Sequence, residues 1–330
     1  MHKTSTRPLI RLMLTASLAL TSLAGAQAAT TLKLAHFAAE SHPAHTAALQ
    51  LKKNVEARTN GDVLIELYPA NQLGSPPDQL EQTTMGVIDM NLPTQGALDK
   101  YEKAFATVMT PYAFASYADA HRVLDGPFYN WVAPRLEKKG LVLLSTWEYG
   151  FRNVTNSKHP INTPEDMKGL KLRTPPELQI MAALEAAGAT TTQIAFPELV
   201  AALNQGVVDG QENPIGVIYH FKLYEVQKNL ALTQHVYNSM THVISRSSWE
   251  KLTPEQQTIL REESRAAGLL MRKLVAEQES AEITKIEAAG VKVTRPDTAK
   301  FRALMQPAYD RVADYAGQEN MKTFLDMLSK

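Results

Sequence analysis

Hydrophobic and polar residues alternate in several short stretches of the chain, and other stretches carry an apolar residue every three or four positions. The first pattern predicts half-buried strands and the second predicts amphipathic helices. We expect strands at residues 31–36, 62–69, 87–93, 169–173, 190–194 and 207–214. Helices are expected between them, at residues 44–59, 75–86, 178–187 and 196–206. Strands that alternate with helices in this way indicate an α/β protein whose sheet is covered on both faces.

The longest helical pattern covers residues 253–290 and is interrupted only by Gly268. Thr253 suits the N-cap position and Pro254 suits the first turn of a helix. A helix of about 35 residues would be about 50 Å long, which exceeds the width of one domain. A coiled coil is the alternative, but the apolar positions do not keep a heptad repeat. We therefore expect one long helix that crosses two lobes.

A second series of predicted strands and helices begins near Gly150. The length of the chain favours two domains of ordinary size. We find no internal repeat, no low-complexity tract and no flexible linker between the two series. The two lobes are therefore expected to be joined by strands rather than by a tether.

Residues 1–28 resemble a secretory signal peptide. They begin with the basic residues Lys3, Arg7 and Arg11, continue with an apolar run over residues 12–23, and end in Ala-Gln-Ala at 26–28. The apolar run is too short to span a bilayer, which argues against the alternative of a retained membrane anchor. We expect cleavage after residue 28 and a periplasmic protein.

Composition excludes some classes of protein. The 34 basic and 34 acidic residues balance. Residues 1–28 hold three of the basic residues and none of the acidic ones, so the remainder is slightly acidic. A nucleic-acid-binding protein would need a basic face, so we expect no nucleic acid partner. The chain contains no cysteine, which rules out disulfides and thiolate metal sites.

The common enzyme motifs are absent: we find no G-x-S-x-G, H-E-x-x-H, Walker or G-x-G-x-x-G pattern. His36, His42 and His45 lie close together in the sequence and could be metal ligands, but histidines at a strand end and in a loop are more often surface or capping groups. We therefore expect a protein that is not an enzyme and that holds neither a metal nor a cofactor.

Two arginines at predicted strand ends, Arg152 and Arg173, are the main candidates for binding chemistry. Each alone could form a surface ion pair. As a pair they favour an anion, because the planar guanidinium group grips a carboxylate with two hydrogen bonds, and ligands of α/β sheets bind at strand ends. Phe196 could line the same site or belong to the core. Asn213 could line it or initiate a turn.

Six motifs in order give the chain a resemblance to the substrate-binding proteins of tripartite ATP-independent periplasmic (TRAP) transporters. They are LKLAHF with HPAH, LYPANQLGS, G-x-R-N-x-T-N, MKGLKLRTPP, FPELVAALNQGVVDGQENP and KLYEVQKNLALTQHVYN. The resemblance implies the fold of a two-lobed periplasmic binding protein, with an interlobe ligand cleft and a long bracing helix. On this basis lobe I comprises residues 29–150 and 239–278, and lobe II comprises residues 151–238 and 279–330.

The resemblance also implies roles for individual residues. The arginine of the K-L-R-x-P motif, Arg173, forms the salt bridge with the carboxylate of the ligand. Arg152, Phe196 and Asn213 fall on the family's other second-lobe contacts, and we expect Tyr149 to join them.

The first lobe departs from the sialic-acid-binding members of this family. Those members have an acidic residue and an arginine where this chain has Thr94 and Ala97, and an asparagine where it has Phe37 beside His36. Sialic acid is therefore not expected. A neutral lobe that bears hydroxyl groups suits a uronate or another sugar acid, and we expect His36, Phe37 and Thr94 to contact it. A C4-dicarboxylate would need a second cation.

The resulting hypothesis is a monomeric periplasmic protein that captures an organic acid, most simply a sugar acid such as a uronate or aldonate, and delivers it to the membrane subunits of a TRAP transporter. The same role for a C4-dicarboxylate, a keto acid or another small carboxylate is an alternative. A secreted hydrolase with a carboxylate substrate and an adhesion or sensor module are alternatives from other classes.

Overall fold

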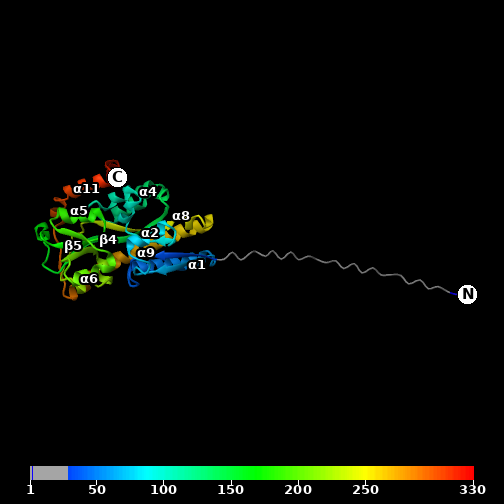
Figure 1. The fold of residues 1–330 in the computed structure, drawn as a ribbon, viewed down its shortest axis with the longest axis horizontal. Coiled ribbons are helices and arrows are strands. Elements are labelled where there is room, and N and C mark those ends of the chain that lie inside the picture. The colour runs from blue at the N-terminus through cyan, green and yellow to red at the C-terminus, as the bar shows by residue number, and fades with distance from the viewer. Residues whose placement is uncertain (1, 3–28) are drawn as a thin grey trace.

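The computed structural model describes residue 2 and residues 29–330 (Figure 1). The predicted signal peptide lies, apart from residue 2, outside the described residues. The strands are β1 (Thr30–Ala35), β2 (Val63–Tyr68), β3 (Met90–Asn91), β4 (Leu141–Asn156), β5 (Lys171–Thr174), β6 (Thr190–Gln193), β7 (Gly210–Pro214), β8 (Asn229–Ala231), β9 (Tyr237–Ser245) and β10 (Lys292–Thr294).

Helices cover this sheet and make up most of the rest of the described chain. The α-helices are α1 (Pro43–Arg58), α2 (Pro76–Thr84), α3 (Tyr117–Asp125), α4 (Pro127–Glu137), α5 (Leu178–Ala186), α6 (Leu199–Asn204), α7 (Ile215–His220), α8 (Arg246–Trp249), α9 (Pro254–Ala288), α10 (Thr298–Arg302), α11 (Gln306–Ala316) and α12 (Gln318–Leu328). Short 3-10 helices are η1 (Gln95–Lys100), η2 (Lys103–Met109), η3 (Pro164–Met167), η4 (Phe196–Glu198) and η5 (Leu223–Glu225).

The predicted α/β fold is confirmed, with two differences at element boundaries. The strand expected at 87–93 is reduced to the two residues of β3. The helix expected at 196–206 begins with the 3-10 turn η4, in which the Glu198 amide donates to the Ala195 carbonyl three residues earlier, and becomes α-helical only at α6.

The strand β4 joins the two parts of the sheet. The strand order is β2-β1-β3-β9-β4-β7-β5-β6; β8 also pairs with β4, and β10 pairs with β8. Residues 141–151 of β4 pair with β9, and residues 152–156 pair with β7. The hydrophobicity pattern did not identify β4, because all of its residues are buried and a strand that is buried on both faces shows no alternation.

The long helix α9 is confirmed. The Thr253 hydroxyl accepts a hydrogen bond from the Gln256 amide, and the Gln256 side chain reaches back to the Thr253 amide, so a capping box begins the helix. The helix packs against α1, β4 and α7. A side chain at Gly268 would lie 2.9 Å from the ring of Trp147 and 3.0 Å from the Thr146 carbonyl, so the glycine lets α9 approach β4 closely.

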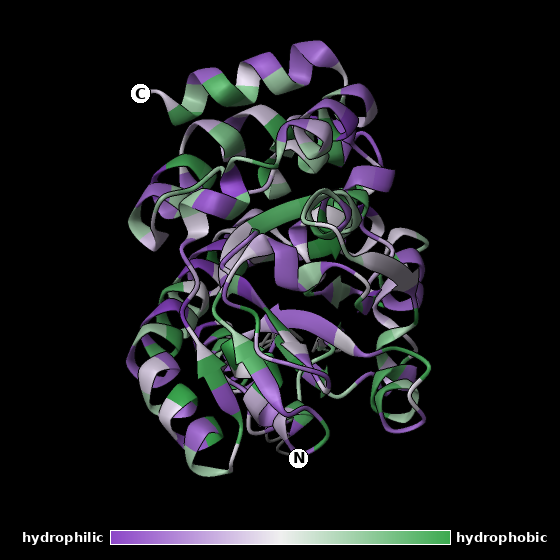
Figure 2. Ribbon diagram, turned by 90° about the vertical axis from the view of Figure 1, so that its left-hand side faces the viewer, coloured by the Kyte–Doolittle hydropathy of each residue, from purple (hydrophilic) through white to green (hydrophobic). Residues whose placement is uncertain are grey.

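The buried apolar residues form three clusters rather than one. One lies around α1, β1 and α9 and includes Trp147, the second includes Phe105, Phe128 and Phe324, and the third includes Phe301. The helix that ends at the C-terminus, α12, shows both hydrophobic and hydrophilic segments in Figure 2, and it buries Met321 and Phe324.

The division into lobes stays a prediction. The helix α12 packs against α3 and α4, which belong to the predicted lobe I, although its own residues were assigned to lobe II. In the described part of the chain, no helix is both long enough and apolar enough to cross a membrane.

Candidate functional site

A cavity of about 340 Å³ lies at the ends of several strands. Its lining includes most of the residues expected from the sequence: Phe37, Thr94, Tyr149, Arg152, Arg173, Phe196 and Asn213. They come from the predicted lobes I and II together. Ala97, where the sialic-acid-binding members carry an arginine, also lines the cavity.

The structure does not bring His36 to this cavity. Its side chain is fully buried, and its Nε2 atom lies 3.2 Å from Nδ1 of His45. Phe37 lies in the bend that follows β1 and lines the cavity, whereas His36 packs against His45 of α1.

Arg173 is a buried cation without an acidic partner. It is only 2 % exposed, and its Nε atom donates to the Ile194 carbonyl at 2.8 Å. Within the described residues its terminal Nη groups have no hydrogen bond, and no carboxylate lies within ion-pair distance. Burial lowers the pKa of Arg173 to about 10, so the group is still charged at neutral pH. Its two terminal nitrogens are free to bind an anion.

The position of Arg173 follows from the local sequence. The strand β5 pairs in parallel with β6 and β7, and Arg173 lies near its carboxyl end. Thr174 ends the strand, and the two prolines that follow cannot continue its hydrogen bonds. The guanidinium carbon lies 5.8 Å from the ring centroid of Phe196, within the range of a cation–π contact.

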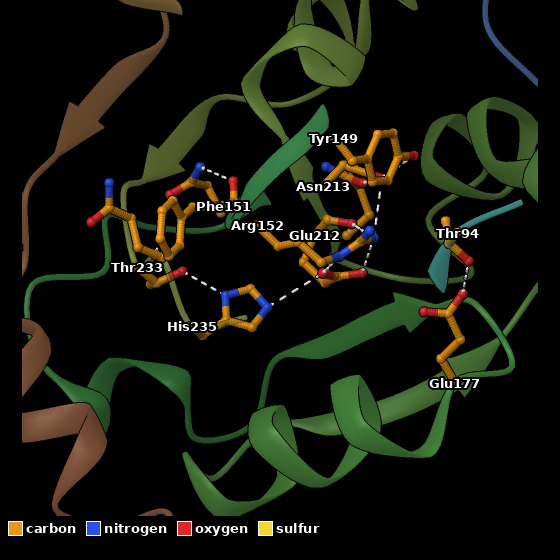
Figure 3. A network of polar contacts seen from close by, with 12 residues as sticks. Thr94, Tyr149, Phe151, Arg152, Glu177, Glu212, Asn213, Thr233 and His235 are labelled. Atoms are coloured by element: carbon orange, nitrogen blue, oxygen red, sulfur yellow. Dashed lines mark hydrogen bonds and ion pairs between the residues drawn. The ribbon is translucent and has the colours of Figure 1, made fainter. Parts of the chain in front are cut away.

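Arg152 is equally buried but is already neutralised (Figure 3). Its Nε and Nη2 atoms donate to the two carboxylate oxygens of Glu212, at 2.5 and 2.8 Å. Burial acts to lower the pKa of Arg152, but the charge of Glu212 outweighs it and raises the pKa. His235 lies on the far side of the same carboxylate, with Nε2 3.3 Å from Oε2. The two arginines that the sequence paired therefore differ: only Arg173 has an uncompensated charge.

Arg152 also orients the amide of Asn213. Nη2 of Arg152 donates to Oδ1 of Asn213 at 3.1 Å, and the hydroxyl of Tyr149 donates to the same oxygen at 3.4 Å. Nδ2 of Asn213 donates to Oε1 of Gln211 at 2.5 Å. Burial raises the pKa of Tyr149 to about 12, so its hydroxyl keeps its proton.

Aromatic rings form one wall of the cavity. The ring of Phe37 makes edge contacts with Tyr149 and Phe196, at centroid distances of 5.2 and 5.9 Å. Phe221 stacks on Phe37 from behind, with an interplanar angle of 18°. Such a wall gives a ligand an apolar surface beside the charged group.

Glu177 was missed by the sequence analysis. It lines the same cavity, and its Oε1 atom accepts a hydrogen bond from the Thr94 hydroxyl at 2.6 Å. Two signals could have indicated it. Glu177 lies four residues after Arg173, beyond the same strand end, and it directly follows Pro176 at the start of the next helix.

The histidines that were considered as metal ligands do not form a metal site. In the described residues no group of three or more histidine or carboxylate side chains is arranged to hold an ion. Nδ1 of His42 accepts a hydrogen bond from the Ala44 amide and caps α1. Burial lowers the pKa of both His36 and His42 to about 3, so neither carries a charge at neutral pH.

Comparison with known proteins identifies the family. Residues 34–315 match the family described as bacterial extracellular solute-binding protein, family 7 (DctP). The chain is 34 % identical over 304 residues to the sialic acid-binding periplasmic protein SiaP of Vibrio cholerae, covering 92 % of this chain and 94 % of SiaP. It is 35 % identical over 266 residues to the 2,3-diketo-L-gulonate-binding periplasmic protein YiaO of Escherichia coli, covering 81 % of each chain.

Solved structures support the same family assignment. A TRAP periplasmic solute-binding protein from Sulfitobacter sp. NAS-14.1, crystallised with β-D-galacturonate, superposes with a TM-score of 0.87 at 30 % identity, over 91 % of this chain and 99 % of that one. The relatives named for a function are solute-binding proteins and not enzymes, which sets aside the hydrolase alternative. The chain thus belongs to family 7 of the bacterial extracellular solute-binding proteins, the DctP family of TRAP periplasmic solute-binding proteins.

Proposed function

We propose that this protein binds a sugar acid, a uronate or an aldonate, in the cavity around Arg173, and presents it to the membrane subunits of a TRAP transporter. The observation that carries the proposal is the guanidinium group of Arg173, which is buried, charged and without an acidic partner in the described residues. A ligand carboxylate would supply the missing charge. Removal of water on binding strengthens such a pair.

The rest of the cavity favours a ligand with hydroxyl groups. The pair of Arg152 and Glu212 adds no net charge, and Thr94, Tyr149 and Asn213 present neutral polar groups. Solved relatives carry D-glucuronate, D-erythronate and galactonate, in addition to the galacturonate noted above. A C4-dicarboxylate fits less well. Its second carboxylate would need a second buried cation. Besides Arg173, the cation of the lining that has no buried partner is Lys100, and Lys100 is exposed to solvent.

Binding can be tested by calorimetry and thermal unfolding. We expect one of D-galacturonate, D-glucuronate, D-galactonate and D-erythronate to bind with one ligand per chain. At 100 times its Kd it should stabilise the folded state by about 2.7 kcal/mol. D-galactose, which lacks a carboxylate, is the matched control and should not bind. The proposal fails if none of the acids binds, or if succinate or pyruvate binds more tightly than all of them.

We further propose that the protein is exported and works in the periplasm as a monomer. The support is the signal-peptide pattern of residues 1–28 and the periplasmic relatives. Mass spectrometry of the periplasmic fraction should find a chain that begins at Ala29 or Thr30. Recovery of a chain that still begins at Met1 would contradict this expectation.

A further inference from the structure

Glu177 places a second charged group in the cavity wall, and this group also lacks an oppositely charged partner. The residue is 5 % exposed. Its Oε1 atom is held by the Thr94 hydroxyl at 2.6 Å, and its Oε2 atom has no hydrogen-bond partner within residues 29–330. Among the described residues no lysine, arginine or histidine lies within ion-pair distance of it. Burial raises the pKa of Glu177, and the nearby charge of Arg152, which acts to lower it, does not outweigh this effect.

Glu177 does not stabilise the helix that it begins. It occupies the N-cap position of α5, but its side chain does not accept a hydrogen bond from the helix. Gly96 makes room for Glu177 and for Met109, because a Cβ atom at Gly96 would clash with the sulfur of Met109 and would lie 3.0 Å from Oε2 of Glu177. Burying a carboxyl group without a partner is unfavourable, and such groups tend to occur at functional sites.

The nearest charges do not cancel that of Glu177. Arg152 is held by two hydrogen bonds to Glu212, so it is not available as a partner. Figure 3 shows Glu177 and Thr94 together, to one side of the group formed by Arg152, Glu212, Asn213 and Tyr149. The cavity therefore combines an uncompensated cation, Arg173, with an uncompensated acid, Glu177. A further buried carboxyl group of the lining, Asp99, accepts hydrogen bonds at both oxygens, from Gln179 and Tyr315.

We propose that Glu177 determines the specificity of the cavity: it accepts hydrogen bonds from hydroxyl groups of a ligand whose carboxylate is bound by Arg173, and it repels a second carboxylate. A carboxylate oxygen has more than one lone pair, so Oε1 can accept from a ligand while Thr94 holds it. The ligand class is then the hydroxylated monocarboxylates, and the corresponding dicarboxylates are rejected. This inference rests on the proposed function.

The test compares ligands that share a carbon chain. Galactarate differs from D-galactonate and D-galacturonate in having a carboxylate at both ends. We expect the parent protein to bind the better of the two monocarboxylates at least about tenfold more tightly than galactarate, because like charges in a buried site repel strongly. In Glu177→Gln, whose amide has the same shape and no charge, this preference should fall by about tenfold or more.

A matched control is Glu319→Gln. Glu319 is exposed to solvent and is not among the residues that line the cavity, so the same change of charge there should leave the preference unchanged. The inference is overturned if the parent binds galactarate as tightly as the monocarboxylates, a result that does not depend on any variant. It is also overturned if Glu177→Gln keeps the preference of the parent. If the parent binds none of the three acids and neither D-glucuronate nor D-erythronate, the proposed function fails as well, and this outcome is visible without mutation.

Discussion

Replacement of Arg173 by alanine is expected to weaken binding of the ligand by roughly 30-fold to several thousand-fold. The ligand carboxylate would lose the one buried cation of the cavity that is not already neutralised. Loss of one partner of a buried charge pair costs about 2–5 kcal/mol, and each 1.4 kcal/mol corresponds to about tenfold in affinity. Isothermal calorimetry with the tightest sugar acid measures the effect.

Two further variants show whether the geometry of Arg173 matters. Arg173→Lys should recover only part of the affinity, because an ammonium group cannot form the two parallel hydrogen bonds of a guanidinium group. Arg246→Ala is the control. Arg246 forms an exposed pair with Glu250, and its loss should not change binding. If Arg173→Ala folds and binds as tightly as the parent, Arg173 is not the anchor.

Arg152 should behave differently from Arg173, because its partner belongs to the protein. Arg152→Ala would leave the buried carboxylate of Glu212 without its main cation. Breaking a buried pair in this way typically costs about 3–5 kcal/mol of folding stability. The unfolding midpoint of Arg152→Ala should therefore fall clearly below that of Arg173→Ala, in which no protein ion pair is broken.

The folded protein is expected to lose stability steeply below pH 6.5, because of buried neutral histidines. Burial lowers the pKa of His242 from 6.5 to about 3, and His36 and His42 behave alike. In the unfolded chain these groups take up protons below about pH 6.5, whereas the folded chain binds them only near pH 3. Stability is therefore lost as the pH falls through this window. Each histidine costs about 2 kcal/mol by pH 5.

His242 is the cleanest of the three histidines to test. Its Nδ1 atom lies 2.7 Å from the Ser264 hydroxyl, its Nε2 atom has no hydrogen-bond partner in the described part of the chain, and burial alone accounts for its lowered pKa. The loss of unfolding free energy between pH 7 and pH 5 should be about 2 kcal/mol smaller in His242→Gln than in the parent, measured by urea unfolding. His159→Gln, which changes an exposed histidine, should keep the pH dependence of the parent. If the unfolding free energy of His242→Gln falls between pH 7 and pH 5 by as much as that of the parent, the expectation is contradicted.

The elements that are determined by residues close together in the sequence could be predicted from the sequence. The helix α9 is specified by its capping box at Thr253 and by a helical pattern that is interrupted only by Gly268, and both signals are local. The position of Arg173 near the end of a strand could also be predicted from the sequence, because a short strand that is followed by two prolines must end there. Together with the family resemblance, this was enough to identify seven residues of the cavity wall, whereas the eighth expected residue, His36, lies elsewhere.

The electrostatic roles of those residues depended on contacts between distant parts of the chain. Arg152 and Glu212 are 60 residues apart in the sequence, so only the antiparallel pairing of β4 and β7 shows that the pair is neutral. The contact between Thr94 and Glu177 spans 83 residues and joins the two predicted lobes. Local patterns determine which residues reach a strand end. Which of their charges are left uncompensated is set by long-range packing, because burial and partner distance decide the energy of a charge.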